Sequence, residues 1–598
     1  MSGAGPLIHA SQVGYTCSAR KRMVVAAEHA AGIPEFHIQD VGKIDAEGFG
    51  AYESWKPVFR GRLVPHNGPM GKYLVGDFSA VNAPAVYRAV LPGLPGSTDI
   101  AAWSHPFVVA DGVFSRLPSL FLDYVHGQRC GEFENELRGP CHLDDGVRSD
   151  TGEQVDAVGG WHDAGDLRKW MGTTPLPILG FFDARRRLGW MRNNWHERPH
   201  EDDVLAEASW GIRWMLKMQD PSTGMFYEDV AGGGNSRVQP GMVWWYENHA
   251  GCCADNAGNF FSDNRPKSGD ERGVRVQYHP IVQYLAVTIL VEATDHFHAH
   301  YPAFSQLCRQ AALRCWDFMK TRRRDDFHTW TSVIAWRLLA ALRLHAQGIV
   351  PEFEVSALVS VLLDLQSRNW GFWHMDSTRR EPYRGIVSSA QPIIALASFI
   401  EADYDHPLAG PAREALERCR DQYVAPMLGT NPFGIMPFGA YEGPRPKGDV
   451  YHEWVDGLVY RFFMPNHAPE RVNHGLSSHW TSWAHGLALM GNVLDDSACK
   501  NAAGDQLAWL MGGNPLNASM ISGVGCSNAS PYSRFYGTLP GGFCVGPRGT
   551  AEDSIYVDMA GRTEWNSGEY WLAPLGNALM ALAALLPARV LPSGKLGH

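Results

Sequence analysis

The pattern of hydrophobic and polar positions divides the chain into two parts of different character. Up to about residue 110, short alternating or continuous apolar runs are separated by Gly, Pro and Asn turns, which predicts strands. The predicted strands lie at residues 21–28, 34–40, 55–64, 72–79, 85–92 and 105–110. Short strands at this spacing are typical of a β-sandwich of about a hundred residues, and we expect one over residues 1–111.

From residue 112 onward, apolar residues recur at intervals of three and four, which is the period of an amphipathic helix. The pattern is clearest at 207–219 and 331–346. The predicted helices lie at residues 114–128, 173–190, 202–219, 278–299, 304–322, 328–347, 352–366, 388–403, 410–424, 473–494, 497–511 and 568–587. This number of helices fits an (α/α)6 barrel over residues 112–598.

Several connections between the predicted helices are long and irregular, at roughly 225–277, 367–387, 428–472 and 512–566. Loops of this length are uncommon as plain connections, and they often carry a functional site on a rigid scaffold. We therefore expect these loops to line a site.

Composition limits the classes of function. With 598 residues the chain is long enough for more than one core, and 45% hydrophobic with 19% charged residues is typical of a globular protein. It contains no apolar run of eighteen residues, so no membrane span is expected. The formal net charge of −11, without a Lys/Arg-rich run, does not favour a nucleic acid as partner.

The N-terminal sequence MSGAGPLIHASQVGY has neither a basic segment nor an apolar segment of the kind found in signal peptides. It predicts a cytoplasmic protein, or a secreted one if a leader has been trimmed from the sequence. The eleven cysteines are an odd number in a long chain. They fit reduced thiols, some of them bound to metal, better than a disulfide framework.

The stretch GGWHDAGDLRKW at residues 159–170 carries the most chemistry. Asp163 and Asp166 lie three positions apart, which places them on one face of a helix or directs both into one cavity from a loop. A turn role is the alternative, because Asp and Gly are ordinary turn residues. The neighbouring Trp161 offers an aromatic plate and His162 a ligand or base, and both favour a site.

A second cluster lies just upstream, in QRCGEFENELRGPCH at residues 128–142. Cys130, Cys141 and His142 lie close in sequence, and His162 follows twenty positions later. Two thiolates and two imidazoles form a closed tetrahedral zinc set of the structural kind. Buried thiols beside a hydrogen-bonded histidine are the alternative, because the spacing is not a CxxC pair.

Near the C-terminus, Glu569 stands at the start of a strongly apolar helix. A carboxyl group in apolar surroundings keeps its proton to higher pH, so Glu569 is a candidate proton donor. A glutamate that interacts with the helix dipole is the alternative, and Glu564 is a competing candidate. Far upstream, the aromatic run at Trp244 and Trp245 suggests a sugar platform, with core packing as the alternative.

Together these motifs resemble glycoside hydrolase family 9. GGWHDAGD (159–166) is similar to the active-site signature of the family, and the opening HASQVGY to the start of its immunoglobulin-like domain. The resemblance implies an immunoglobulin-like β-sandwich followed by an (α/α)6 barrel that hydrolyses β-linked glucans with inversion. By the match, Asp166 is the general base, Asp163 helps to hold the water, and Glu569 is the general acid.

A bacterial subgroup of the family carries QRCG, CH(L)DD and GGWHDAGD, and the Cys and His residues of these motifs bind zinc. All four ligand positions are occupied here, by Cys130, Cys141, His142 and His162. The resemblance therefore implies a structural zinc that pins the loop of Asp163. It also allows calcium, without indicating ligands.

The substrate-binding part departs from the family pattern. Where the family has PHHR, this chain has PYSR, so that Tyr532 and Ser533 replace both histidines while Arg534 is kept. The candidate substrate-binding residues are Trp161, Trp244, Trp245, Tyr532, Arg534 and Trp571.

We expect an endo-β-1,4-glucanase-like enzyme acting on a β-linked oligo- or polysaccharide. The alternatives are an exo-acting glycosidase on short cello- or amino-sugar oligosaccharides and a non-hydrolytic carbohydrate-binding protein. The lost histidines and the missing export signal favour a smaller substrate. The sequence gives no indication of the oligomeric state.

Overall fold

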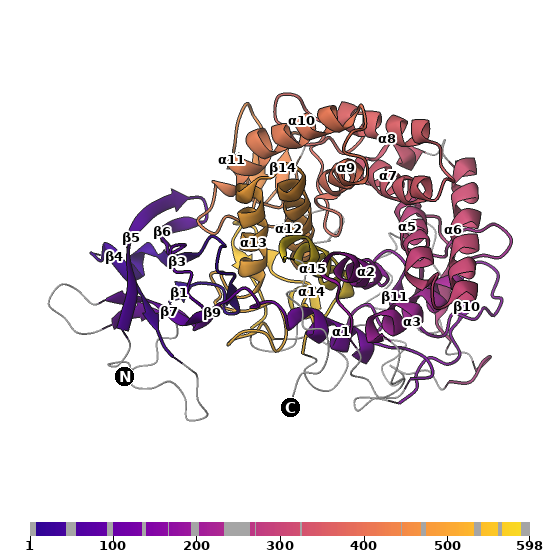
Figure 1. Ribbon diagram of the computed structural model, residues 1–598, viewed down its shortest axis with the longest axis horizontal. Coiled ribbons are helices and arrows are strands. Elements are labelled where there is room, and N and C mark those ends of the chain that lie inside the picture. The colour runs from indigo at the N-terminus through magenta and orange to yellow at the C-terminus, as the bar shows by residue number, and fades with distance from the viewer. Residues whose placement is uncertain are drawn as a thin grey trace.

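The structure is a computed structural model of the chain. It describes residues 7–30, 32–42, 56–92, 100–133, 139–165, 167–192, 202–231, 264–268, 271–322, 326–443, 445–467, 474–530, 540–559 and 565–587. A β-sheet domain precedes a helical domain (Figure 1).

Strands β1 to β9 build the N-terminal domain, and all but one of their pairings are antiparallel. Neighbouring strands follow the order β1-β3-β6-β5-β4-β7-β9-β2, with β8 against β7. The long β5 pairs with β4 through its first half, residues 56–62, and with β6 through its second half, residues 63–68. The bounds are Ile8–His9, Gly14–Tyr15, Arg22–Ala26, Glu35–Asp40, Lys56–Gly68, Gly71–Asp77, Ala85–Pro92, Ile100–Trp103 and Phe107–Val109.

Alternating side chains of these strands form a core that belongs to the sheet domain. Phe36 and Ile38 of β4 point inward with Met23 of β3, and Phe78 and Phe107 close the same cluster. The short strands β1, β2 and β8 do not appear in the prediction from sequence, because two to four residues are too few to show a period of two.

Each predicted helical segment contains a helix, and the described helices alternate between an inner and an outer position along the chain. The inner helices are α2 (Leu176–Leu188), α5 (Pro280–Phe297), α7 (Thr331–Ala346), α9 (Gln391–Ala402), α12 (Leu476–Val493) and α15 (Leu572–Leu585). The outer ones are α1 (Leu117–Gly127), α3 (Asp203–Lys217), α6 (Pro302–Arg322), α8 (Glu352–Asp364), α10 (Ala409–Cys419) and α13 (Ser497–Leu510).

The inner helices form a closed ring. In the order α2, α5, α7, α9, α12 and α15 each helix packs on the next, and α15 packs back on α2. Around this ring, α6 packs on α5, α8 on α7, α10 on α9 and α13 on α12 (Figure 1). Figure 1 is viewed nearly along the axis of the ring.

The apolar pattern explains which helices lie inside. In α12 every residue from Leu476 to Gly491 is buried, and in α15 every residue from Leu572 to Ala583. The outer α8 buries only one stripe, made of Val355, Leu358, Val359 and Leu362. A helix that is apolar all round belongs in the interior, whereas an amphipathic one belongs at the surface.

Ion pairs join the C-terminal halves of the inner helices. Arg187 of α2 contacts Glu401 of α9 at 2.6 Å. Arg186 contacts Glu292 of α5 at 2.8 Å, and Glu292 also contacts Arg343 of α7 at 2.8 Å. The loops that enter the inner helices therefore gather at the opposite end of the ring.

The sheet domain contacts the helical domain through α13 and the loop after it. Arg22 pairs with Asp505 of α13 at 2.8 Å, and a nitrogen of His9 lies 2.9 Å from Asn517 Oδ1. The rings of Tyr73 and Phe433 meet edge to face. These contacts attach the sheet domain to the outside of the ring (Figure 1).

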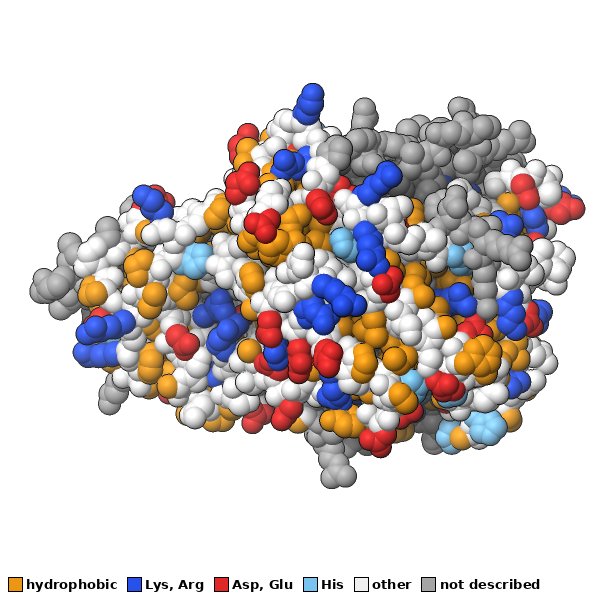
Figure 2. All heavy atoms as spheres, turned by 90° about the horizontal axis from the view of Figure 1, so that it is seen from above, with side chains coloured by type: hydrophobic (Ala, Val, Ile, Leu, Met, Phe, Trp, Pro, Cys, Tyr) orange, Lys and Arg blue, Asp and Glu red, His pale blue; other side chains and the backbone are white. Residues whose placement is uncertain are grey.

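None of the helices in the described part of the chain is long and apolar enough to cross a membrane. On the face shown in Figure 2, acidic and basic side chains are interspersed. That face does not present the continuous basic surface that double-stranded nucleic acid attracts.

Candidate functional site

The loop with Asp163 pairs with the segment that enters α15. The Leu572 N–H donates to the Asp163 carbonyl oxygen at 2.9 Å, and the Gly165 N–H donates to that of Tyr570 at 3.2 Å. The Asp163 N–H donates to the Arg168 carbonyl oxygen at 2.7 Å, which folds the loop on itself. Two segments about 400 positions apart thus lie side by side at the entry of the ring.

Three side-chain donors converge on the Asp163 carboxylate, which is only 2% exposed. The hydroxyls of Thr173 and Thr174 donate to Oδ1 at 2.8 and 3.1 Å. The Trp571 indole N–H donates to Oδ2 at 3.0 Å. Burial of a carboxylate is costly unless it is hydrogen-bonded, and these donors meet that requirement.

Glu569 lies two residues before Trp571 and is 4% exposed. Its carbonyl oxygen accepts the Val545 N–H at 2.7 Å, which fixes the backbone. Burial raises the pKa of Tyr124 well above its usual range, and the charges of Tyr570, Asp163 and Glu569 raise it further. Asp163 and Glu569 therefore both lie close enough to Tyr124 for their charges to affect its pKa. Asp166 lies outside the described residues.

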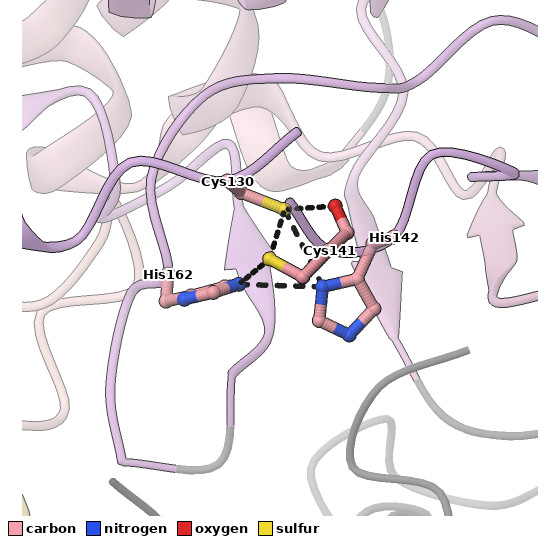
Figure 3. A group of neighbouring side chains, drawn as sticks. All are labelled: Cys130, Cys141, His142 and His162. Atoms are coloured by element: carbon pink, nitrogen blue, oxygen red, sulfur yellow. Dashed lines mark hydrogen bonds between the residues drawn. The ribbon is translucent and has the colours of Figure 1, made fainter. Parts of the chain in front are cut away.

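Cys130, Cys141, His142 and His162 form one buried cluster (Figure 3). Their ligand atoms all lie within 4.8 Å of one another. Cys130 Sγ is 4.0 Å from Cys141 Sγ and 3.5 Å from His142 Nδ1, and His162 Nε2 is 3.7 Å from Cys141 Sγ and 3.4 Å from His142 Nδ1.

These separations are close to those between the ligand atoms of a tetrahedral metal site. Bond lengths of about 2.3 Å to sulfur and 2.0 Å to nitrogen place the ligand atoms roughly 3.3–3.8 Å from one another. Burial alone would raise the pKa of the Cys130 thiol, but the Cys141 thiol and the charges of Lys169, His162 and His142 hold it well below its usual range. Thiolate is the form that binds metal, so the residues fit a metal ion.

Buried ion pairs connect this cluster to the loop of Asp163. Asp145 pairs with Lys169 at 2.7 Å and with Arg272 at 2.5 Å. The Arg272 guanidinium also donates to the Leu167 carbonyl oxygen at 2.5 Å, and Lys169 donates to that of Ala157 at 2.6 Å. The sequence analysis did not find Arg272, because it lies more than a hundred positions from the loop that it holds.

A known protein family matches a part of the chain that includes residues of the candidate site. A sequence model described as glycosyl hydrolase family 9 matches residues 115–338, which include the metal cluster and the Asp163 loop. This part of the chain carries the sequence pattern of glycoside hydrolase family 9. The resemblance found in its motifs is confirmed.

Two curated relatives are similar to parts of the chain. A cellodextrinase of Butyrivibrio fibrisolvens is 25% identical over 227 residues, which cover 35% of this chain and 37% of that protein. An endoglucanase D of Acetivibrio thermocellus is 23% identical over 268 residues, which cover 42% of this chain and 38% of the relative. The chain spans little more than a third of the length of these relatives.

Solved structures of family 9 proteins match the whole fold. One from Bacteroides ovatus has a TM-score of 0.68 and 19% identity, and the match covers 98% of this chain and 99% of that one. A Zn-binding triple mutant of the family 9 endoglucanase J30 has a TM-score of 0.64 and 17% identity, and covers 96% and 100%. At this identity, the matches show the shared fold of a helical domain with an N-terminal β-sheet domain.

The structure corrects the prediction for Trp161. Its side chain is completely buried, and its indole N–H donates to Glu207 Oε1 at 2.5 Å. A methyl group at Gly211 would lie only 2.1 Å from its ring, so α3 packs directly on the indole. Trp161 has no free face for a sugar, and its contacts attach the loop to α3.

Of the other predicted substrate-binding residues, Trp571 is partly buried and its N–H is used by Asp163. The remaining ones lie outside the described residues and stay predictions: Trp244, Trp245, Tyr532 and Arg534. The competing Glu564 and the pair Cys252 and Cys253 also lie outside them. The nine cysteines in the described part of the chain are free thiols.

Glu207 on α3 is a structural residue that the sequence analysis missed. Its carboxylate is fully buried and accepts from Trp161, from Arg129 Nε at 3.0 Å and from His126 Nδ1 at 2.9 Å. Burial alone would raise the pKa of Glu207, but the charges of Arg129 and His126 lower it below its usual range. Trp161 and Arg129 each adjoin a cluster ligand, so Glu207 supports the cluster.

We expect Glu207→Gln to lower the free energy of unfolding by about 3 kcal/mol at pH 7, because it leaves the buried Arg129 without its counter-charge. A lowered folded-state pKa stabilises the protein above the unfolded pKa of about 4.3, and this contribution is lost as pH falls through the folded value. Urea unfolding at pH 7 and at pH 3–4 measures both effects.

The matched control is Asp364→Asn. It removes an exposed pair with Arg379, and we expect a cost below about 1 kcal/mol. Equal losses for the two variants, or a loss for Glu207→Gln that does not shrink at low pH, would contradict the assigned role.

Proposed function

We propose that the protein is an inverting glycoside hydrolase that cleaves β-linked glucan. The observation that carries the proposal is the convergence of Asp163 and Glu569, from opposite ends of the helical domain, at the entry of the helix ring. A carboxylate that handles water and a carboxylic acid that protonates the leaving group are the two groups that glycoside hydrolysis requires.

In this proposal Glu569 protonates the glycosidic oxygen, and Asp166 removes a proton from the attacking water. Asp163 accepts a hydrogen bond from the same water and holds it in place. An inverting enzyme keeps its two carboxyl groups about 6.5–9.5 Å apart to leave room for water. The buried setting of Glu569 supports its role as the acid.

The finer description of the fold belongs to the same proposal. Six inner and six outer helices in alternation support an (α/α)6 barrel over residues 112–598. The pairing of successive parts of β5 with β4 and with β6, around a core that belongs to the sheet domain alone, supports an immunoglobulin-like domain over residues 1–111. The entry of the barrel, where the loops gather, is the expected place of the substrate.

We propose that the metal is zinc, held by Cys130, Cys141, His142 and His162. Two sulfur and two nitrogen ligands are typical of zinc, whereas calcium takes oxygen ligands. A closed set of four leaves no open position for substrate, so bound zinc would hold the loop and take no part in the reaction. The printed name of a Zn-binding family 9 endoglucanase agrees with this choice.

The names of the curated relatives, cellodextrinase and endoglucanase, support a β-linked glucan as the substrate class. We expect the purified protein to release reducing ends from such a glucan, with an α-anomer as first product. The panel is carboxymethyl cellulose, lichenan, cello-oligosaccharides and chito-oligosaccharides, with ¹H NMR to follow the anomer.

Each result of this experiment decides between specific functions. Loss of viscosity on the polymers supports endo cleavage. Release of monomer or dimer from short cello-oligosaccharides alone keeps β-glucan hydrolysis but makes it exo-acting. A β-anomer as first product overturns inversion, cleavage of chito-oligosaccharides alone overturns the substrate class, and binding without any release overturns hydrolysis.

A further inference from the structure

The hydrogen bonds of Asp163 come from both ends of the barrel sequence. Thr173 and Thr174 precede the first inner helix, α2, and Trp571 precedes the last, α15. All three donate to one carboxylate, two to Oδ1 and one to Oδ2. The carboxylate therefore lies where the first and last inner helices meet. Oδ1 accepts from the segment before α2, and Oδ2 accepts from the segment before α15.

We propose that Trp571, Thr173 and Thr174 are positioning residues that hold the Asp163 carboxylate in one orientation for the reaction. The inference rests on the proposed function and deepens it. It also replaces the predicted role of Trp571 in sugar binding, because the polar edge of the indole is used by Asp163.

The chemistry of the donors supports a fixed orientation. An indole N–H can only donate a hydrogen bond, so Oδ2 must accept it. The two hydroxyls add donors at Oδ1, so a rotation of the carboxylate would break hydrogen bonds at both oxygens. A carboxylate held in this way keeps the direction in which it can accept a hydrogen bond from water, which agrees with the proposed role.

The indole is itself held in place. Gly475, the residue before α12, has φ 101°, and a methyl group there would lie 3.1 Å from Trp571 Cζ3 and 2.6 Å from Ile386 Cγ2. The backbone before α12 thus approaches one side of the ring, next to Ile386. This close approach limits how far the indole can turn away from Asp163, to which its N–H donates.

The Trp571→Phe variant tests the proposal, because it keeps an aromatic ring and removes only the donor. We expect kcat to fall about tenfold to a hundredfold with little change in KM, since a catalytic group loses its orientation. Thr174→Val should lower kcat in the same way, whereas Thr173→Ser, which keeps the hydroxyl, should lower it far less.

The matched control is Trp373→Phe. Trp373 is also buried and donates its indole N–H, to the Leu362 carbonyl oxygen at 2.9 Å, but it has no bond with Asp163. We expect this variant to lower the melting temperature with a kcat close to that of the wild type. A fall in kcat equal to that of Trp571→Phe would overturn the proposal, since loss of structure would then explain both.

A second readout does not depend on activity. In protein labelled with ¹⁵N-tryptophan, the indole resonance that is missing from Trp571→Phe belongs to Trp571. We expect this resonance to move upfield in Asp163→Asn, where the acceptor has no charge. It should stay in place in Glu354→Gln, which changes a carboxylate of α8 that pairs with Arg337. A resonance that does not respond to Asp163→Asn overturns the proposal.

The two readouts separate the two hypotheses. If the wild-type protein hydrolyses no β-glucan, the proposed function fails, and the indole resonance still decides whether Trp571 holds Asp163. If the wild type is active and Trp571→Phe retains its kcat, the positioning role fails while the function stands. Should Trp571→Phe not fold, Thr174→Val decides whether the side chains that donate to Asp163 set kcat.

Discussion

Replacing Glu569 with glutamine is expected to lower kcat on a β-glucan by about 10²–10⁴-fold. The amide has nearly the shape of the carboxyl group but delivers no proton to the leaving oxygen. The loss should be much smaller on a 2,4-dinitrophenyl β-cellobioside, because that leaving group departs without protonation. Steady-state kinetics on both substrates, with the melting temperature as a check on folding, measure the effect.

Two further variants complete this experiment. Asp163→Asn should lower kcat on both substrates, because a residue that acts on the water is needed whatever the leaving group. Glu564→Gln should remain close to wild type. A rescue by dinitrophenyl substrate in Glu564→Gln, with normal activity in Glu569→Gln, would transfer the role of the acid to Glu564.

The second large effect is expected from loss of the metal. Cys141→Ser should reduce bound zinc from about one ion per chain to none, and lower the free energy of unfolding by on the order of 5 kcal/mol, because binding free energy of a structural metal is folding free energy. Activity should fall with it, since the same loop carries Asp163. Elemental analysis and thermal unfolding with and without a chelator measure metal content and stability.

The control for this variant is Cys419→Ser, which alters a buried thiol of α10 outside the metal cluster. We expect Cys419→Ser to keep its zinc and to respond to the chelator as the wild type does. A wild-type protein without zinc, or full zinc content in Cys141→Ser, would contradict the assignment of these ligands.

The sequence alone was sufficient for the local elements. A helical period over ten or more residues predicted the inner and outer helices, and the strongly apolar sequence of α15 agrees with its place inside the ring. Strands of five or more residues showed their alternation, whereas β1, β2 and β8 did not. Their pairing depends on partners elsewhere in the sheet, which no local pattern records.

The metal ligands could also be predicted from the local sequence. Cys130, Cys141, His142 and His162 lie within about thirty positions of one another, and few residue types bind zinc. Their combination is rare enough to stand out in one sequence. The structure confirms that the four side chains meet in one buried cluster that could hold a metal ion.

Only the tertiary structure decided which partners hold the side chains of the candidate site in place. Trp161 and Trp571 both lie beside a candidate catalytic residue, yet the indole of one is buried against Glu207 and that of the other donates to Asp163. Nothing in the local sequence distinguishes them, because the partner that decides the role lies 46 positions away in one case and 408 in the other. Hydrogen bonds depend on distance in space, so residues that are remote in sequence become neighbours only when the ring of helices closes.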